Sequence, residues 1–123
     1  MTLDAGALIA VEKNPKLLAA ILETARRHRD APIIPAVALA QAWRGSRSAR
    51  IGMLLNHATV EPFTELRARQ AGELLARSGT SDVVDAAVVA SAATRGDIVV
   101  TSDPDDIRLL AGFADRPIRI RPI

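Results

Sequence analysis

The chain has 123 residues, of which 49% are hydrophobic and 24% are charged, and its formal net charge is +2. This length fits a single domain over residues 1–123, and this composition excludes a disordered or low-complexity chain. Because cysteine is absent and only two histidines are present, disulfide frameworks, thiolate zinc sites and multi-histidine metal sites are excluded as well. No basic leader followed by a long apolar segment is visible, so we expect a cytoplasmic protein without a membrane segment.

The first half of the chain alternates short apolar strands with helices. Asn14 is a good N-cap and Pro15 suits the first position of a helix, which the basic run 26–29 ends. Gly45 and Ser46 interrupt a later helix. The predicted elements are, in order, a strand at 2–3, helices over 7–11 and 15–29, a strand at 32–34, helices over 36–44 and 50–57, and a strand at 59–61.

The second half continues the alternation. Its predicted elements are a helix over 65–77, a loop at 78–81, a helix over 83–94, a strand at 98–100, a helix over 104–110 and a strand at 118–121. The continuous apolar run 98–100 is typical of a strand buried in a parallel sheet. Strands separated by helices predict an α/β fold with three layers, α/β/α, around a central parallel sheet.

Four aspartates are expected at one edge of this sheet. Asp4 directly follows the first strand, and Asp103 lies three residues past the 98–100 strand. Asp82 and Asp85 lie in the first turn of the helix that runs antiparallel into that strand, so they belong to the same, carboxyl edge, where such sheets bind ligands. Carboxylates gathered there repel one another, and Mg²⁺ or Mn²⁺ would relieve the repulsion. The chemistry this favours is metal-assisted hydrolysis of a phosphodiester.

Each carboxylate also has a purely structural interpretation. Asp103 would cap the helix that begins at Pro104, with Asp106 as the second residue of the cap. Asp82 and Asp85 would only complement the dipole of their helix. These interpretations stay open at this point.

Two other classes of phosphate-handling protein also cluster aspartates at strand ends. A phosphoacceptor receiver domain needs a lysine at the end of a late strand, and neither Lys13 nor Lys16 lies there. An aspartyl phosphatase needs a second acid two residues after the first, but Gly6 occupies that position after Asp4. Both classes are therefore disfavoured.

Three segments resemble the motifs of PIN-domain ribonucleases, and in the same order. Residues 4–9 (DAGALI) resemble the opening of these proteins, 85–92 (DAAVVASA) their central acidic helix, and 99–103 (VVTSD) their late strand with its threonine and acid. The spacing matches across nearly the whole chain, which resembles the small VapC-type toxins of bacterial toxin–antitoxin pairs. The resemblance implies a metal-dependent endoribonuclease that hydrolyses RNA phosphodiesters, forms a homodimer and is blocked by a VapB-like antitoxin.

The resemblance also assigns roles to residues of this chain. Asp4 and Asp85 would bind Mg²⁺ or Mn²⁺, Asp103 would complete the acidic site, and Thr101 would assist through its hydroxyl. Asp82, one turn before Asp85, would add a further carboxylate to the metal site.

The chain departs from the family pattern at two positions. The third helix usually carries a glutamate where this chain has Gln41, which offers one neutral oxygen and accepts no proton. Gly6 stands where a hydroxyl residue is frequent. We therefore expect reduced activity, and the alternative is a catalytically weakened PIN protein that binds its antitoxin or RNA.

Three arginines flank the end of the Gln41 helix. If Gln41 faces the site, Arg44, Arg47 and Arg50 lie near its mouth and would hold RNA phosphates. Otherwise they form an ordinary solvated surface.

Overall fold

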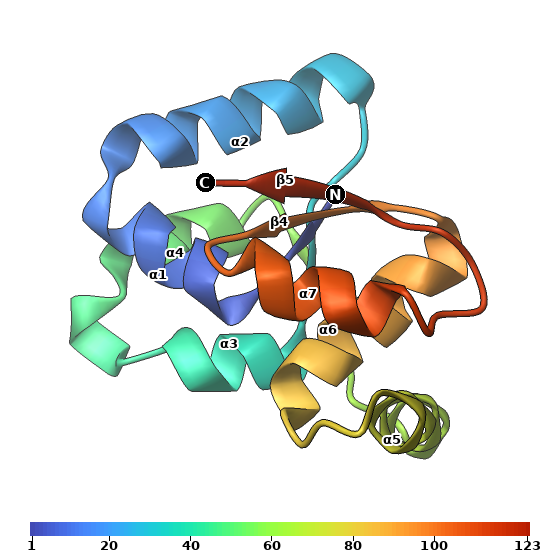
Figure 1. Cartoon of the computed structure of the whole chain (residues 1–123). Coiled ribbons are helices and arrows are strands. Elements are labelled where there is room, and N and C mark those ends of the chain that lie inside the picture. Colours follow the sequence, from blue (N-terminus) through green and yellow to red (C-terminus); the bar gives the residue numbers. More distant parts are fainter.

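Five parallel strands form the centre of the computed structural model, which describes residues 1–123 (Figure 1). The strands lie in the order β3-β2-β1-β4-β5. Thr2 is in register with both Ile33 and Val99, so β1 lies in the middle of the sheet. The bounds are β1 (Thr2–Leu3), β2 (Ile33–Pro35), β3 (Thr59–Glu61), β4 (Ile98–Thr101) and β5 (Arg119–Pro122).

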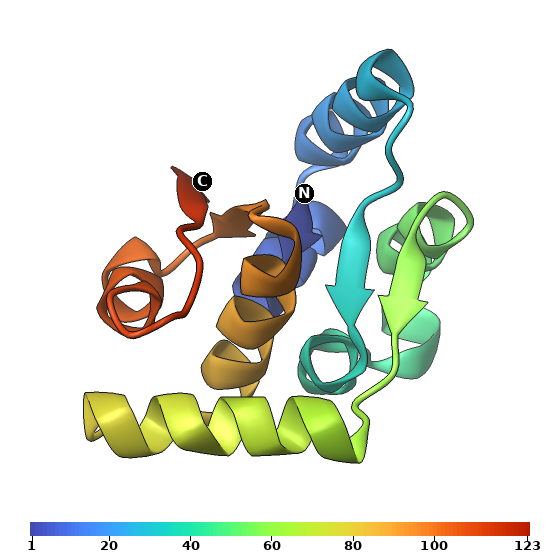
Figure 2. The ribbon, with the colours of Figure 1, turned by 90° about the vertical axis from the view of Figure 1, so that its right-hand side faces the viewer.

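Helices cover both faces of the sheet. They are α1 (Ala5–Lys13), α2 (Pro15–His28), α3 (Ala36–Ala42), α4 (Ala49–Leu55), α5 (Glu65–Ser78), α6 (Val83–Arg95) and α7 (Pro104–Ala111). Helices α1, α2 and α4 pack together on one face, α5, α6 and α7 pack on the other, and α3 contacts both α1 and α6. Figure 2 shows α5 lying across the bottom of the view below α6, with only its first turn near the ends of β2 and β3. The three-layer α/β/α prediction is confirmed, and no helix has the length and apolarity that a membrane crossing requires.

The hydrophobic core is divided in two by the sheet. Successive residues of a strand point to opposite faces, and β4 shows this directly, since Val99 packs with α5, α6 and α7 while Val100 packs with α1, α2 and α4. Helix α6 is buried almost along its whole length, with every residue from Ala86 to Ala93 buried. The middle of the sheet is therefore covered on both faces, whereas the outer strands β3 and β5 stay largely exposed.

Several predicted boundaries shift by a few residues. Helix α1 begins at Ala5 rather than at residue 7, because the Asp4 carboxylate caps it. Helix α3 ends at Ala42 rather than at residue 44, and a short 3₁₀ turn, Gly45–Arg47, follows with Gly45 at a φ of 62°. The last strand runs over Arg119–Pro122 and pairs with all four residues of β4, one position later than predicted.

Candidate active site

Asp4 is the most enclosed acid of the carboxyl edge. It follows β1 directly, is only 4% exposed, and accepts a hydrogen bond from the Ala7 amide at 2.7 Å. Burial raises the pKa of Asp4 above its ordinary value, although hydrogen bonds from the Thr101 hydroxyl and from the Ala7 amide partly oppose the shift. This carboxylate is thus held in one orientation at the N-terminus of α1, as a preorganised ligand would be.

Thr101 connects Asp4 to Asp103. It is the last residue of β4 and is fully buried, and its Oγ1 accepts the Asp103 amide hydrogen at 2.9 Å. The same hydroxyl hydrogen-bonds the Asp4 carboxylate. Asp103 begins α7, but its side chain makes no capping hydrogen bond. The capping interpretation of Asp103 is therefore wrong for its side chain.

Asp82 and Asp85 begin α6 and line one hollow with Asp106. Asp82 caps the helix, since its Oδ1 accepts the Asp85 amide hydrogen at 3.0 Å. Asp85 is half-buried. Burial, and then repulsion from Asp82, Asp4, Asp106 and Asp103 in that order, raise the pKa of Asp85 to about 7. Four neighbouring carboxylates oppose the ionisation of Asp85, and a cation bound among them would relieve this repulsion.

Asp106 is a member of this group that the sequence suggests only as part of a helix cap. Repulsion by Asp103, together with a hydrogen bond between their two side chains, raises the pKa of Asp106. Asp103 and Asp106 are three residues apart, a spacing that puts side chains on one face of a helix. In the sequence, this spacing is the only indication that Asp106 lies near Asp103, and it equally fits an ordinary helix start.

These five residues, called the aspartate cluster below, are Asp4, Asp82, Asp85, Asp103 and Asp106. None of them takes part in an ion pair of the chain. Asp97, at the opposite edge of the sheet, differs: it accepts a hydrogen bond from Thr2 Oγ1 at 2.9 Å and lies 3.8 Å from Arg95 Nε. What distinguishes the carboxyl edge is that five acids without an ion pair lie within electrostatic reach of one another there.

The donor set of the aspartate cluster fits a hard divalent cation. Its oxygens come from carboxylates and from the Thr101 hydroxyl, and such oxygen ligands suit Mg²⁺ and Mn²⁺. In this structure no three His, Asp or Glu side chains already form a metal-ligating group, so binding of an ion requires the carboxylates to move closer together. The predicted metal ligands Asp4, Asp82, Asp85 and Asp103 lie within electrostatic reach of one another, and their binding of an ion stays a prediction.

Gln41 lines a different hollow from the one that Asp82, Asp85 and Asp106 line. It is exposed near the end of α3 and lines a hollow with Glu12, Lys13, Arg44 and Arg47, which no aspartate of the cluster lines. No hydrogen bond joins Gln41 to any of those aspartates. The arginines beside it also differ from one another. Arg44 and Arg47 are exposed and form no ion pair, whereas the half-buried Arg50 donates a hydrogen bond to the Glu12 carbonyl at 2.6 Å and so ties α4 to α1.

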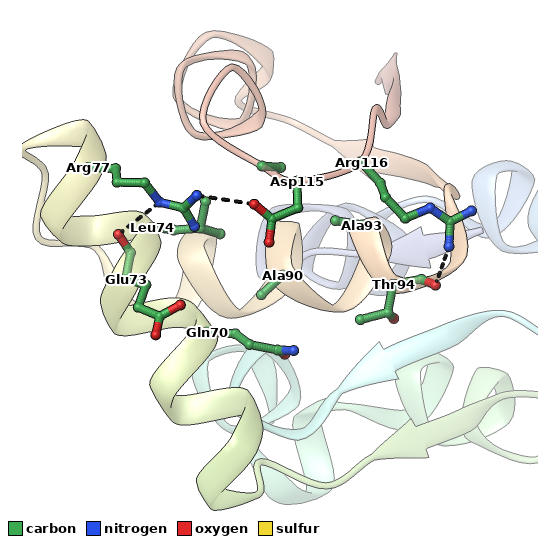
Figure 3. A pocket seen from close by; sticks show the side chains of 10 residues that line it. Gln70, Glu73, Leu74, Arg77, Ala90, Ala93, Thr94, Asp115 and Arg116 are labelled. Carbon is green, nitrogen blue, oxygen red and sulfur yellow. Dashed lines mark hydrogen bonds and ion pairs between the residues drawn. The ribbon is translucent and has the colours of Figure 1, made fainter.

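A further hollow lies between α5 and α6, away from the aspartate cluster (Figure 3). Leu74, Ala90 and Ala93 line it, and an ion pair of 3.2 Å between Arg77 and Asp115 spans it. Since no residue of the cluster lines this hollow, Asp115 offers a matched control for substitutions at the cluster.

The comparison with family models decides between the classes considered above. The model of the PIN domain matches residues 1–112, which include all of the aspartate cluster, Gln41 and Thr101. The chain belongs to the PIN domain family. Members of this family are in general nucleases, which are hydrolases, and they typically use divalent metals. A search of curated proteins found no match.

Proposed function

We propose that this PIN domain is a Mg²⁺- or Mn²⁺-dependent endoribonuclease and acts as a VapC-type toxin. The observation that carries the proposal is the aspartate cluster, five carboxylates without a cationic partner at the carboxyl edge of a PIN-domain sheet. Membership of the family supports a nuclease, and the uncompensated charge supports the need for a cation. The VapB-like antitoxin, the homodimer and the cytoplasmic location belong to the same proposal and are supported by the sequence resemblance.

Each site residue has a part in the proposed reaction. Asp4, Asp85 and Asp103 would hold the ion, and Asp82 would add negative charge beside it. Bound there, the ion would lower the pKa of a water molecule and neutralise charge on the phosphodiester. Thr101 fixes the orientation of Asp4 through its buried hydroxyl and holds the start of the β4–α7 loop through the Asp103 amide. A fixed carboxylate loses little freedom when it binds, which favours affinity.

The hollow beside Gln41 supports an RNA partner. Its cations, Lys13, Arg44 and Arg47, form no ion pair within the chain, so they are available to phosphate groups. Arginine forks suit phosphate particularly well. We propose that RNA phosphates on either side of the scissile bond contact this hollow, while Arg50 is engaged in holding α1 and α4 together.

The direct test is cleavage of RNA by the purified protein, freed of any antitoxin. We expect slow cleavage of structured RNA in Mg²⁺ or Mn²⁺, and none in EDTA. Activity should rise with metal concentration into roughly the millimolar range, as expected for a site with few carboxylate ligands. If total cellular RNA stays intact even at high Mn²⁺, the nuclease proposal is wrong, and the catalytically weakened binding module replaces it.

Gln41 is expected to weaken metal binding because it supplies no charge. Replacing Gln41 with glutamate should tighten Mn²⁺ binding several-fold in titration calorimetry, since it restores one carboxylate on the side of the site where α3 lies. Gln70→Glu is the matched control: it adds the same charge at the α5–α6 hollow, away from the aspartate cluster. Equal Mn²⁺ affinities of the two variants would place position 41 outside the ligands of the ion.

A further inference from the structure

Gly6 is the second residue of α1, and its backbone gives no reason for a glycine. Only Gly45, Gly79 and Gly96 have the positive φ values that favour this residue. A glycine inside a helix costs stability relative to alanine, so some other feature should account for it. The space around Gly6 does. A Cβ atom at this position would overlap the Oγ of Ser102, and it would lie 3.2 Å from the Ser102 Cβ and 3.5 Å from Asp4 Oδ1.

The Ser102 hydroxyl therefore lies against the first turn of α1, next to the carboxylate of Asp4. It occupies the place that the first side-chain atom of residue 6 would take in any other amino acid. Ser102 is exposed, and its hydroxyl has no hydrogen-bond partner within the chain. Its neighbour Thr101 is buried, and that hydroxyl is engaged with both Asp103 and Asp4. Of the two hydroxyls at the end of β4, only that of Ser102 is free to meet a ligand.

A free hydroxyl has a specific chemical use among carboxylates. Ionised carboxylates only accept hydrogen bonds, and the non-bridging oxygens of a phosphodiester also only accept. A phosphate group brought to the aspartate cluster therefore needs a donor as well as a cation. A serine O–H beside Asp4 supplies that donor and adds no net charge to the site.

We propose that the Ser102 hydroxyl is a substrate-binding group, which donates a hydrogen bond to a non-bridging phosphate oxygen of RNA held at the aspartate cluster. Gly6 leaves the space in which this hydroxyl lies. The inference rests on the proposed function in one respect, that the ligand is an RNA phosphodiester. It adds Ser102 to the site residues predicted from the sequence, and it explains why position 6 is a glycine.

The test uses two single variants and their combination. Ser102→Ala removes the hydroxyl, and Gly6→Ala forces it to rotate away from its place without removing it. We expect each variant to bind a short fluorescein-labelled single-stranded RNA about tenfold more weakly, as for loss of a hydrogen bond to a charged group. Fluorescence anisotropy in Ca²⁺ measures the binding independently of cleavage. The double variant should bind about as weakly as Ser102→Ala alone, because the hydroxyl that Gly6→Ala displaces is already absent.

Two controls separate this role from a structural one. Gly72→Ala makes the same change inside α5, where a Cβ would meet nothing within 4 Å, and should leave RNA binding unchanged. The swap Gly6→Ser with Ser102→Gly puts a hydroxyl one bond away from that place, from the helix side, and should recover part of the affinity. Thermal unfolding of every variant checks that the fold is retained.

The possible results distinguish this inference from the proposed function. If wild type cleaves RNA in Mn²⁺, and Ser102→Ala binds and cleaves equally well, the role of Ser102 is overturned while the nuclease stands. If wild type does not cleave RNA but binds it in a Ser102-dependent way, the nuclease proposal falls and the role of Ser102 stands. If wild type neither binds nor cleaves RNA, both are overturned. An affinity of the double variant well below that of Ser102→Ala would also overturn the coupling of Gly6 to Ser102.

Discussion

Replacing Asp4 or Asp85 with asparagine is expected to abolish metal-dependent RNA cleavage while the domain stays folded. Each substitution removes one negative charge from the proposed ion site and leaves the shape of the side chain almost unchanged. Loss of a residue that merely supports a metal ligand costs about 10- to 100-fold, so loss of a ligand itself should cost more than about a hundredfold. Initial cleavage rates in Mn²⁺, compared with wild type at equal concentration, measure the effect.

Asparagine is chosen because Asp4 also has a structural duty. Its Oδ1 caps α1 by accepting the Ala7 amide hydrogen at 2.7 Å, and asparagine caps helices about as well as aspartate. The matched control is Asp115→Asn, which breaks an exposed ion pair with Arg77 away from the cluster and should leave the rate unchanged. Full activity of the Asp4 and Asp85 variants would show that these two residues do not belong to the active site. A melting temperature of Asp4→Asn far below that of wild type would show that Asp4 is needed to cap α1 and not for its charge.

The second large effect concerns the stability of the metal-free protein. In EDTA at pH 8, Asp85→Asn should unfold at a higher temperature than wild type, by on the order of 5 °C. The reason is that burial and the neighbouring aspartates raise the pKa of Asp85 to about 7 in the folded state, from an ordinary value of 3.8. Ionised Asp85 therefore destabilises the folded protein, and asparagine carries no charge at any pH.

The pH dependence of this gain follows from the two pKa values. Below about pH 4 Asp85 is protonated in both the folded and the unfolded protein, so it adds no charge penalty. Between pH 4 and 7 the unfolded chain releases its proton while the folded one keeps it, so the free energy of unfolding of wild type falls as pH rises. Above pH 7 both forms are ionised, and the penalty is complete and constant.

Thermal melts of wild type and Asp85→Asn across this pH range test the expectation. The difference in melting temperature should grow from pH 4 to pH 7 and then level off, whereas Asp115→Asn should show no such growth. Saturating Mn²⁺ should raise the melting temperature of wild type more than that of the variant, because only wild type keeps the full set of carboxylates. A constant difference at all pH values would mean that Asp85 ionises normally in the folded state.

The aspartate cluster was largely predictable, and the reason is topological. The carboxyl ends of parallel strands share one edge, so Asp4 after β1 and Asp103 after β4 had to lie near each other once the strands were recognised. The same argument placed Asp82 and Asp85 there, because α6 runs back antiparallel to β4. Asp106 was less predictable, since its spacing from Asp103 fits a helix cap as well as a site.

Other features of the site could not be predicted from the spacing of residues. Gln41 aligns with a site position in the family pattern, yet the hollow that it lines is shared with Lys13 and Arg47 and with none of the aspartates. The shift of the Asp85 pKa depends on how deeply packing buries the side chain and on distances to four other carboxylates. This burial and these distances depend on how the helices pack against the sheet, which the spacing of residues does not specify.

Local periodicity and the general rules of chain connection are therefore enough to predict the order of elements, the parallel sheet and the edge at which the acids gather. The position of the Ser102 hydroxyl over Gly6, on the side of Asp4, becomes visible only in the folded structure. The two residues come from opposite ends of the chain, and their contact depends on how the loop after β4 packs against the first turn of α1. Contacts of that kind are set by the packing of whole elements, which no short motif encodes.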